Sequence, residues 1–523
     1  SNKTPLDLAK DEETRRTLVV HGASSPSIRS LDLSNLGLHS LPVSLIDFPN
    51  LRALPNITQG NPLTTVPYNV ANGSFNDIIS YLQAIKQSGK VPWKSVKVMV
   101  LGKEGSGKTH ILRLLQNQRY DTNKSTNGID ITSLRLDDRE ITWFDFGGQE
   151  VFYPTHQFFL TPQCIYLIVF RLNDDDFLQR VQHWLKTVIQ YTKDSRRAAK
   201  IVVVGTHNDK LASPEDGIAR WKLLQPTLDA HGNISATITL GNKAGLKELK
   251  GAILGAIETS TFAKQLVPST YLDVLNAILR NKTSSQTMDM SSFCAQLPRL
   301  SRIQVEMALK FLSDAGMCFF DDSINLVVAD LQWLADLFKQ VISFYSGVKD
   351  GVVKLSGLKH DQWKDSPDAD VKQYMALLEK FHMAFPRLED DSWVVPSMLK
   401  ENPVSPKLQG VEKAVERYER IYELEAMPSG VMGRLIVRLQ NIKSLEFQEM
   451  WRNGMYVHFG DQLGSVVVEN GTPVRISIQV FSLSRGSSKP LIQILSGECT
   501  SMLNEIFSRH DDKPFKESIL CPH

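Results

Sequence analysis

The residues with the clearest chemical potential form a glycine-rich loop between a predicted strand and a predicted helix. The loop reads Gly102-Lys103-Glu104-Gly105-Ser106-Gly107-Lys108-Thr109. It follows the apolar run 96–101, and apolar residues at helical spacing come after it. Glycines in such a loop let backbone N–H groups surround phosphates, and the next helix directs its positive end at them. The pattern predicts a phosphate-binding loop, in which Lys108 reaches the β- and γ-phosphates and the Thr109 hydroxyl binds Mg²⁺.

A second candidate lies where the apolar strand 141–144 ends. It reads Asp145-Phe146-Gly147-Gly148-Gln149 and contains an Asp-x-x-Gly pattern. We expect Asp145 to hold a Mg²⁺-bound water, the N–H of Gly148 to contact the γ-phosphate, and Gln149 to orient the attacking water. The first three residues also spell the magnesium motif of protein kinases. We reject that interpretation because the kinase glycine-rich loop, its strand lysine and a His-Arg-Asp loop are missing from the sequence.

A polar stretch between these two elements supplies a candidate switch residue. It reads Thr126-Asn127-Gly128-Ile129-Asp130. Thr126 is predicted to close on Mg²⁺ and the γ-phosphate when GTP is present; the alternative is an ordinary threonine of a surface loop. Thr109, Thr126 and Asp145 are therefore the expected metal site, and Lys108, Thr126 and Gln149 the expected catalytic residues. His156 is expected to pack beside this region rather than to act as a general base.

Base recognition is predicted where the apolar strand 201–204 ends, in Gly205-Thr206-His207-Asn208-Asp209. A carboxylate at Asp209 can accept hydrogen bonds from guanine N1 and N2, which adenine does not offer. Most small GTPases have Asn-Lys-x-Asp here, so Thr206 and His207 depart from the pattern and predict a lower affinity for the base. A loop aspartate without a ligand is the alternative. Leu240 stands where Ser-Ala-Lys is usual, and its contribution is expected to come from backbone N–H groups.

The elements that must position these residues alternate between short apolar strands and helical stretches over residues 93–263. Apolar runs at 96–101, 141–144, 165–170 and 201–204 suit a parallel sheet buried on both faces. Beyond this region the chain becomes helix-rich, with candidates at 271–279, 303–312 and 331–344. It then turns to alternating strands, and Asn470-Gly471 between two β-branched runs predicts a hairpin.

The N-terminal part has a different pattern. Residues 1–22 resemble the end of an ankyrin repeat, although an ordinary capping helix is the alternative. Leucines in residues 23–73 recur and close on Leu-Pro or Val-Pro, which is typical of leucine-rich repeats. Two irregular copies bury their faces only against neighbours, so we interpret them as the end of an array. Residues 74–92 are predicted to form a capping and linker helix that begins behind a Ser74 cap and is stopped by Gly89 and Pro92.

Composition limits the class of protein. The net charge of +2 is too balanced for a nucleic-acid or membrane-surface protein. The longest apolar run, 164–170, is far shorter than the roughly 20 residues that span a bilayer, so no membrane insertion is expected. The 5 cysteines are scattered without zinc or disulfide spacing, and no charged-then-apolar leader opens the chain. We therefore expect a cytoplasmic protein of several domains.

Taken together, the motifs resemble the Roco family, which includes the leucine-rich-repeat kinases. The Thr-x-Gly-Ile-Asp and Gly-Gly-Gln-Glu segments, Tyr153-Pro154-Thr155-His156 and the Gly-Thr-His-x-Asp element carry the resemblance. Downstream segments resemble the COR domain of that family: Leu266-Val267-Pro268-Ser269-Thr270-Tyr271, Asp330-Leu331-Gln332-Trp333-Leu334, Pro428-Ser429-Gly430, Arg434-Leu435-Ile436-Val437-Arg438-Leu439 and Trp451-Arg452-Asn453-Gly454.

The resemblance implies an α/β Ras-like Roc GTPase domain over 93–263 and an α+β COR domain after it. The first half of COR, 264–412, is expected to be mainly helical. The second half, 413–523, is expected to be β-rich and to form a homodimer. No kinase domain is expected in this chain.

Two functions stay open on the sequence. The first is a switch that binds guanine nucleotide with Mg²⁺, hydrolyses GTP slowly to GDP, and couples the nucleotide to COR dimerisation and to protein partners on the repeats. The second is a dimeric scaffold that binds guanine nucleotide for stability without meaningful turnover.

Overall fold

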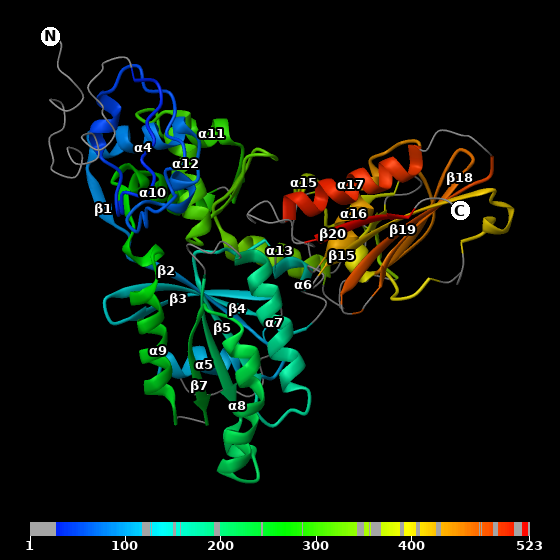
Figure 1. Cartoon of the computed structure of the whole chain (residues 1–523), viewed down its shortest axis with the longest axis horizontal. Coiled ribbons are helices and arrows are strands. Elements are labelled where there is room, and N and C mark those ends of the chain that lie inside the picture. Colours follow the sequence, from blue (N-terminus) through cyan, green and yellow to red (C-terminus); the bar gives the residue numbers. More distant parts are fainter. Residues whose placement is uncertain are drawn as a thin grey trace.

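The computed structural model, drawn in Figure 1, describes most of the chain after residue 27. The described residues are 28–117, 126, 128–149, 153–156, 158–192, 199–241, 244–284, 286–342, 350–354, 356, 368–387, 392–403, 408–424, 430–469, 471, 473–484, 490–506 and 515–520. The predicted ankyrin-like segment 1–22 lies outside them, as do Asn127, Glu150 and Cys521.

The leucine-rich segment folds as irregular turns against one helix. It contains η1 (Val43–Asp47) and α3 (Tyr68–Ala71), and is followed by α4 (Phe75–Ser88). The apolar side chains of the segment and of α4 form one core. Buried Asn61 connects neighbouring turns, because its amide nitrogen donates to the carbonyls of Leu33 and Ile57 at 2.7 and 2.9 Å. The hydroxyl of Ser74 accepts from the N–H of Asp77, which confirms the predicted cap of α4.

The central unit is built on a six-stranded sheet in the order β3-β4-β2-β5-β6-β7 (Figure 1). Its strands are β2 (Ser95–Leu101), β3 (Ile129–Leu136), β4 (Arg139–Phe146), β5 (Ile165–Arg171), β6 (Lys200–Thr206) and β7 (Ile234–Leu240). The four predicted strands are confirmed as parallel neighbours. Two further strands were not predicted from the sequence: β7 extends the parallel sheet, and β3 runs antiparallel to β4 at the edge.

Helices cover both faces of this sheet, as the apolar strands require. They are α5 (Lys108–Leu115), α6 (Tyr153–His156), α7 (Phe177–Thr192), α8 (Pro214–Asp229) and α9 (Leu246–Thr259), with the turn η3 (Asn208–Lys210). The apolar sides of α7 and α8 share one core with the sheet, and those of α5 and α9 share another. Phosphate-loop and base-recognition candidates therefore lie together at the carboxyl ends of the parallel strands, the usual place for ligands in open α/β sheets.

The next unit mixes helices with short strands. Its helices are α10 (Thr270–Ser284), α11 (Met290–Ala295), α12 (Arg302–Asp314), α13 (Leu331–Ile342) and α15 (Asp368–Lys380), with the turns η4 (Phe262–Lys264), η5 (Pro396–Met398) and η6 (Val411–Lys413). Two three-stranded sheets accompany them: β9 (Thr287–Met288) with β10 (Phe319–Asp321) and β11 (Leu326–Val328), and β12 (Val352–Lys354) with β13 (Phe385–Pro386) and β14 (Ser392–Val394). The predicted helices at 271–279 and 303–312 are confirmed, and α13 confirms the described part of the third.

A short ribbon joins the two ends of the central unit. Gly89 and Pro92 were expected to stop the linker helix, and α4 does end at Ser88. The residues after it form β1 (Lys90–Pro92), which pairs antiparallel with β8 (Leu266–Pro268). This pairing was not predicted from the sequence. The sheet domain thus leaves and rejoins the rest of the chain at one place.

The last unit is a six-stranded antiparallel sheet in the order β16-β17-β18-β19-β15-β20, seen at the right of Figure 1. Its strands are β15 (Glu416–Leu424), β16 (Glu446–Trp451), β17 (Gly454–Phe459), β18 (Gln462–Glu469), β19 (Val474–Ser482) and β20 (Phe515–Leu520). Helices α16 (Val431–Gln440) and α17 (Pro490–Ile506) pack on it and complete its core. The predicted hairpin is confirmed by the pairing of β18 with β19.

Candidate functional site

The glycine-rich loop connects β2 to α5 with the backbone shape that the motif predicts. Gly102, Gly105 and Gly107 have φ values of +153°, +73° and +96°, a region that side chains disfavour. A Cβ atom on Gly102 would lie 2.1 Å from the carbonyl oxygen of Val169 on β5. Glycine is therefore required at this position both by the backbone angle and by the close approach of the neighbouring strand.

Lys108 lies in the first turn of α5 and folds back over the loop. Its side chain is buried, and Nζ donates to the carbonyl oxygens of Gly102 and Lys103 at 2.7 and 2.9 Å. Burial lowers the pKa of Lys108 to about 8, while the carboxylates of Asp145 and Glu104 act in the opposite direction. A cation is thus held within the loop, in the place where phosphate oxygens would compete with the backbone carbonyls.

Three oxygen-bearing side chains converge beside Lys108. The Thr109 hydroxyl lies 2.5 Å from Asp145 Oδ2 and 2.7 Å from the Thr126 hydroxyl, and Thr126 lies 2.8 Å from the same carboxylate oxygen. Asp145 is fully buried, and burial raises its pKa although both hydroxyls and Lys108 oppose the shift. Among the described residues, Asp145 Oδ1 has no hydrogen-bond partner. Two hydroxyls and a buried carboxylate are hard oxygen ligands that fit Mg²⁺.

The Asp-x-x-Gly turn lies directly against the glycine-rich loop. A Cβ atom on Gly148 would lie 2.0 Å from the backbone nitrogen of Glu104. Gln149 is at the mouth of the site, and its amide donates to the carboxylate of Glu104 at 3.3 Å. This arrangement places both Gly148 and Gln149 beside the loop, at the end of the site that Lys108 and Asp145 define.

His156 is a core residue. Its ring packs 4.6 Å from the ring of Phe146 and also contacts Tyr153 and Trp184. Burial, with the nearby charge of Lys108, lowers the pKa of His156 to about 3, so the imidazole is neutral at physiological pH. The structure therefore places His156 in the packing environment that was predicted for it.

The base-recognition candidates lie at the ends of β6 and β7. Thr206 is buried, and its hydroxyl lies 2.7 Å from the carbonyl oxygen of Ser106 in the glycine-rich loop. His207 follows with a left-handed φ of +59°, and Asp209 is exposed in η3. Leu240 is buried, so only its backbone is available to a ligand. A Cβ atom on Gly241 would lie 3.8 Å from the backbone nitrogen of Asp209, so the two loops adjoin.

Two features of the site were not predicted from the sequence. Arg171, the last residue of β5, donates from Nε to the carbonyl oxygen of Gly105 at 2.8 Å. The sequence does contain a signal for Arg171: it is a charged residue directly after the apolar run 165–170, and the end of this strand faces the glycine-rich loop. On the other side, Gln332 of α13 accepts from the N–H of Ile131 at 2.7 Å and donates to the carbonyl of Ile129 at 3.1 Å. A helix of the second unit therefore holds the strand that follows Thr126.

Comparisons with known proteins agree with this architecture. The family described as Ras of Complex, Roc, domain of DAPkinase matches residues 97–209, and the C-terminal of Roc, COR-B domain matches residues 415–523. The probable serine/threonine-protein kinase roco11 of Dictyostelium discoideum is 25% identical and aligns with 74% of this chain and 35% of its own length. A Roc-COR-CHAT protease from an unknown prokaryotic organism is 22% identical, over 85% of this chain and 44% of its own.

Among solved structures, Methanosarcina barkeri Roco2 RocCORdC bound to GDP is 21% identical, with a TM-score of 0.48 over 60% of this chain and 98% of that one. The chain spans only 35% and 14% of the lengths of roco11 and the related Dictyostelium discoideum kinase pats1. In the described residues, no helix is both long and apolar enough to cross a bilayer.

The sheet order, the phosphate loop and the Asp-x-x-Gly turn define a Ras-like P-loop domain. Because a Roc domain and a COR-B domain follow one another in the order of that family, the chain belongs to the Roco family.

Proposed function

We propose that the chain binds guanine nucleotide with Mg²⁺ and hydrolyses GTP slowly to GDP and phosphate, as a switch that acts on its COR domain. The observation that carries this proposal is the convergence of Lys108, Thr109, Thr126 and Asp145 beside the glycine-rich loop. Four residues from three separate motifs, up to 37 positions apart in the chain, meet within hydrogen-bond distance of one another or of the loop. A structural role alone does not explain why two hydroxyls meet on a fully buried carboxylate whose charge acts on a buried cation.

Each residue has a distinct task in this reaction. Lys108 and the loop amides bind the phosphates, and Asp209 selects guanine. Thr109 and Thr126 would hold Mg²⁺ directly and Asp145 through a water; the ion supplies charge neutralisation on the phosphate oxygens. Gln149 orients the attacking water once it leaves Glu104. In the absence of an assigned arginine finger, turnover is expected at roughly 10⁻⁴ to 10⁻² s⁻¹, as in other unassisted GTPases.

Coupling to COR is supported by the contacts of α13. Gln332 holds β3 by two hydrogen bonds, and a Cβ atom on Gly128 would lie 3.2 Å from the side chain of Lys339. Phe338 of the same helix packs against Phe158 and Phe159, which follow the Asp-x-x-Gly turn in the chain. Thr126 and Gly148 would become ordered on a γ-phosphate. Because α13 contacts the residues that follow each of them in the chain, this ordering would change the contacts of α13 at two places.

The resemblance to Roco proteins supports further proposals for the whole protein. These are homodimerisation through residues 413–523, protein partners on the leucine-rich segment 23–73 and on any ankyrin-like residues before it, and a cytoplasmic location. The leucine-rich interpretation is supported by Asn61, whose side chain bridges successive turns. The described cysteines are free thiols, which suits a reducing compartment.

The test is single-turnover hydrolysis of GTP and of ATP with Mg²⁺, with the oligomeric state measured by light scattering in each nucleotide. Slow turnover of GTP alone, with a shift in the dimer population, is expected. Tight guanine binding without turnover and with a constant dimer would instead identify a nucleotide-stabilised scaffold. Equal use of ATP would overturn the assignment of Asp209.

A further inference from the structure

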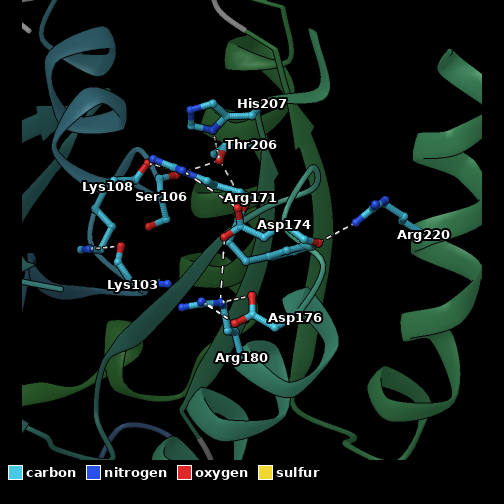
Figure 2. A network of polar contacts seen from close by, with 12 residues as sticks. Lys103, Ser106, Lys108, Arg171, Asp174, Asp176, Arg180, Thr206, His207 and Arg220 are labelled. Atoms are coloured by element: carbon cyan, nitrogen blue, oxygen red, sulfur yellow. Dashed lines mark hydrogen bonds and ion pairs between the residues drawn. The ribbon is translucent and has the colours of Figure 1, made fainter. Parts of the chain in front are cut away.

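Arg171 is the last residue of β5 and lies beside the glycine-rich loop (Figure 2). Besides the 2.8 Å bond from Nε to Gly105, the guanidinium is pressed against the loop, since a Cβ atom on Gly105 would lie 2.3 Å from Nη2. The side chain is 37% exposed, so part of it remains accessible. Asp174, 4.0 Å from Nη1, adds a carboxylate on its far side.

The bond from Arg171 completes a set of donors around the loop. Lys108 donates to the carbonyls of Gly102 and Lys103, and the hydroxyl of Thr206 donates to that of Ser106. The peptide between Gly105 and Ser106 is held at both ends, because its N–H donates to the carbonyl of Lys103 at 3.2 Å. With this turn fixed, the amides at the start of α5 are presented to a phosphate.

The same cation lies near the base-recognition loop, because Arg171 pairs with Thr206 in the register of β5 and β6. Residue 207, a lysine in most small GTPases, is a histidine here, and its Nδ1 lies 2.9 Å from the hydroxyl of Thr206. Burial lowers the pKa of His207, and the charges of Lys210 and Arg171 lower it further. His207 is therefore neutral at physiological pH, and Arg171 is a permanent cation close to it.

We propose that Arg171 is a positioning residue for the nucleotide, which braces the glycine-rich loop through Gly105 and supplies the cation that residue 207 lacks. It fixes how long a guanine nucleotide stays bound and has no part in the hydrolytic step. The inference rests on the proposed guanine-nucleotide function.

Arg180 provides a matched control from the same network. It pairs with Asp176 at 2.5 Å and with Asp174 at 3.9 Å, and Figure 2 shows it on the side of Asp174 away from the base loop. Arg180→Ala removes the same charge and disturbs the same carboxylate. The bond from Arg171 to Gly105 stays intact in that variant.

The experiment measures dissociation of fluorescent GDP and GTP analogues from the full chain by stopped flow, together with single-turnover hydrolysis at saturating GTP. Loss of a charged hydrogen bond is expected to raise both dissociation rates about tenfold or more in Arg171→Ala. The single-turnover hydrolysis rate should stay unchanged. Arg171→Lys should recover part of the loss, and Arg180→Ala should match the wild type.

Dissociation rates within about twofold of wild type in Arg171→Ala would overturn the proposal, because the missing bond is worth more than that. An equal effect of Arg180→Ala would also overturn it, as would a slower hydrolysis step with unchanged dissociation. If Arg171→Ala does not fold, Arg171→Met replaces it, because methionine keeps an aliphatic side chain without the hydrogen-bond donors. The same change in nucleotide dissociation rate is then expected of Arg171→Met. A wild-type chain that binds no guanine nucleotide would refute the proposed function itself, a result that is seen before any variant is made.

Discussion

The two ends of the nucleotide site are built on different principles. At the phosphate end, the side chains of Lys108 and Asp145 are buried, with 5% and 0% exposed, and the backbone adopts angles that only glycine tolerates well. At the base end, Asp209 is exposed and Leu240 offers only its backbone. The phosphate end therefore depends on a fixed chain path, whereas the base end offers one exposed carboxylate.

This difference explains why the sequence pattern is complete at one end and altered at the other. Gly102 cannot be replaced without a clash, since a Cβ atom there would lie 2.1 Å from the carbonyl oxygen of Val169, and Gly105 and Gly107 have φ values that side chains disfavour. A cation near the base can come from any neighbouring strand, and here the end of β5 provides Arg171. Altered base motifs are therefore best judged from the neighbouring strand ends as well as from the motif itself.

The largest expected effect is at the phosphate end, in Lys108→Ala. The variant loses the cation that faces the phosphates and two bonds that shape the loop, so guanine nucleotide binding should weaken by about a hundredfold or more. Isothermal titration with GDP measures it. Arg113→Ala, on the same helix, is the control. Normal binding by Lys108→Ala would mean that the site is misassigned.

Asp209→Asn tests whether one exposed carboxylate really selects the base. The amide replaces one acceptor by a donor that faces the guanine N–H groups, so the preference for GTP over ATP should fall by about tenfold to a hundredfold. Competition of ATP against a fluorescent GDP analogue measures the ratio, with Glu215→Gln as a nearby charge control. An unchanged preference would remove Asp209 from base recognition.

Gln149→Leu separates binding from turnover at the phosphate end. Leucine cannot orient water, so single-turnover hydrolysis should slow by about tenfold or more while GTP affinity changes little. Equal rates in the variant and the wild type would show that Gln149 stays on Glu104 and takes no part in the reaction.

The smallest expected effect is a fall in guanine nucleotide affinity of about tenfold per pH unit above pH about 8, which follows from the lowered pKa of Lys108. In the ligand-free state the ammonium loses its proton above pH about 8, and binding of phosphates must restore it. Guanine nucleotide affinity should therefore be constant below pH 8 and fall as the pH rises above it. In the same window the free energy of unfolding of the ligand-free protein should rise, because the unfolded chain holds this proton up to its ordinary pKa. A flat affinity profile between pH 7 and about pH 9 would contradict the buried cation.

Most of the phosphate end could be predicted from the sequence because its chemistry requires particular residues at fixed spacing. The strands β2, β4, β5 and β6 were visible as continuous apolar runs. The edge strand β7 was missed because only every second side chain is partly covered, and β3 because its exposed positions resemble a loop. Arg171 belongs to no motif, and the COR-like segment that contains Gln332 does not predict its contact; only the folded chain brings these residues to Gly105 and to β3.

The ribbon of β1 and β8 has a mechanical consequence. It ties the residues before the Roc domain to those after it, and neighbouring bonds reinforce it: Leu266 donates to Thr65 at 2.9 Å, and Tyr81 donates to Leu266 at 2.9 Å. Tension applied between the leucine-rich segment and COR acts at Lys90 and Pro268, which pair at the same end of the ribbon, so these bonds carry the load before the nucleotide-binding sheet does. The nucleotide domain lies between the two paired strands. While the ribbon holds, a load on the protein can leave the bound nucleotide undisturbed.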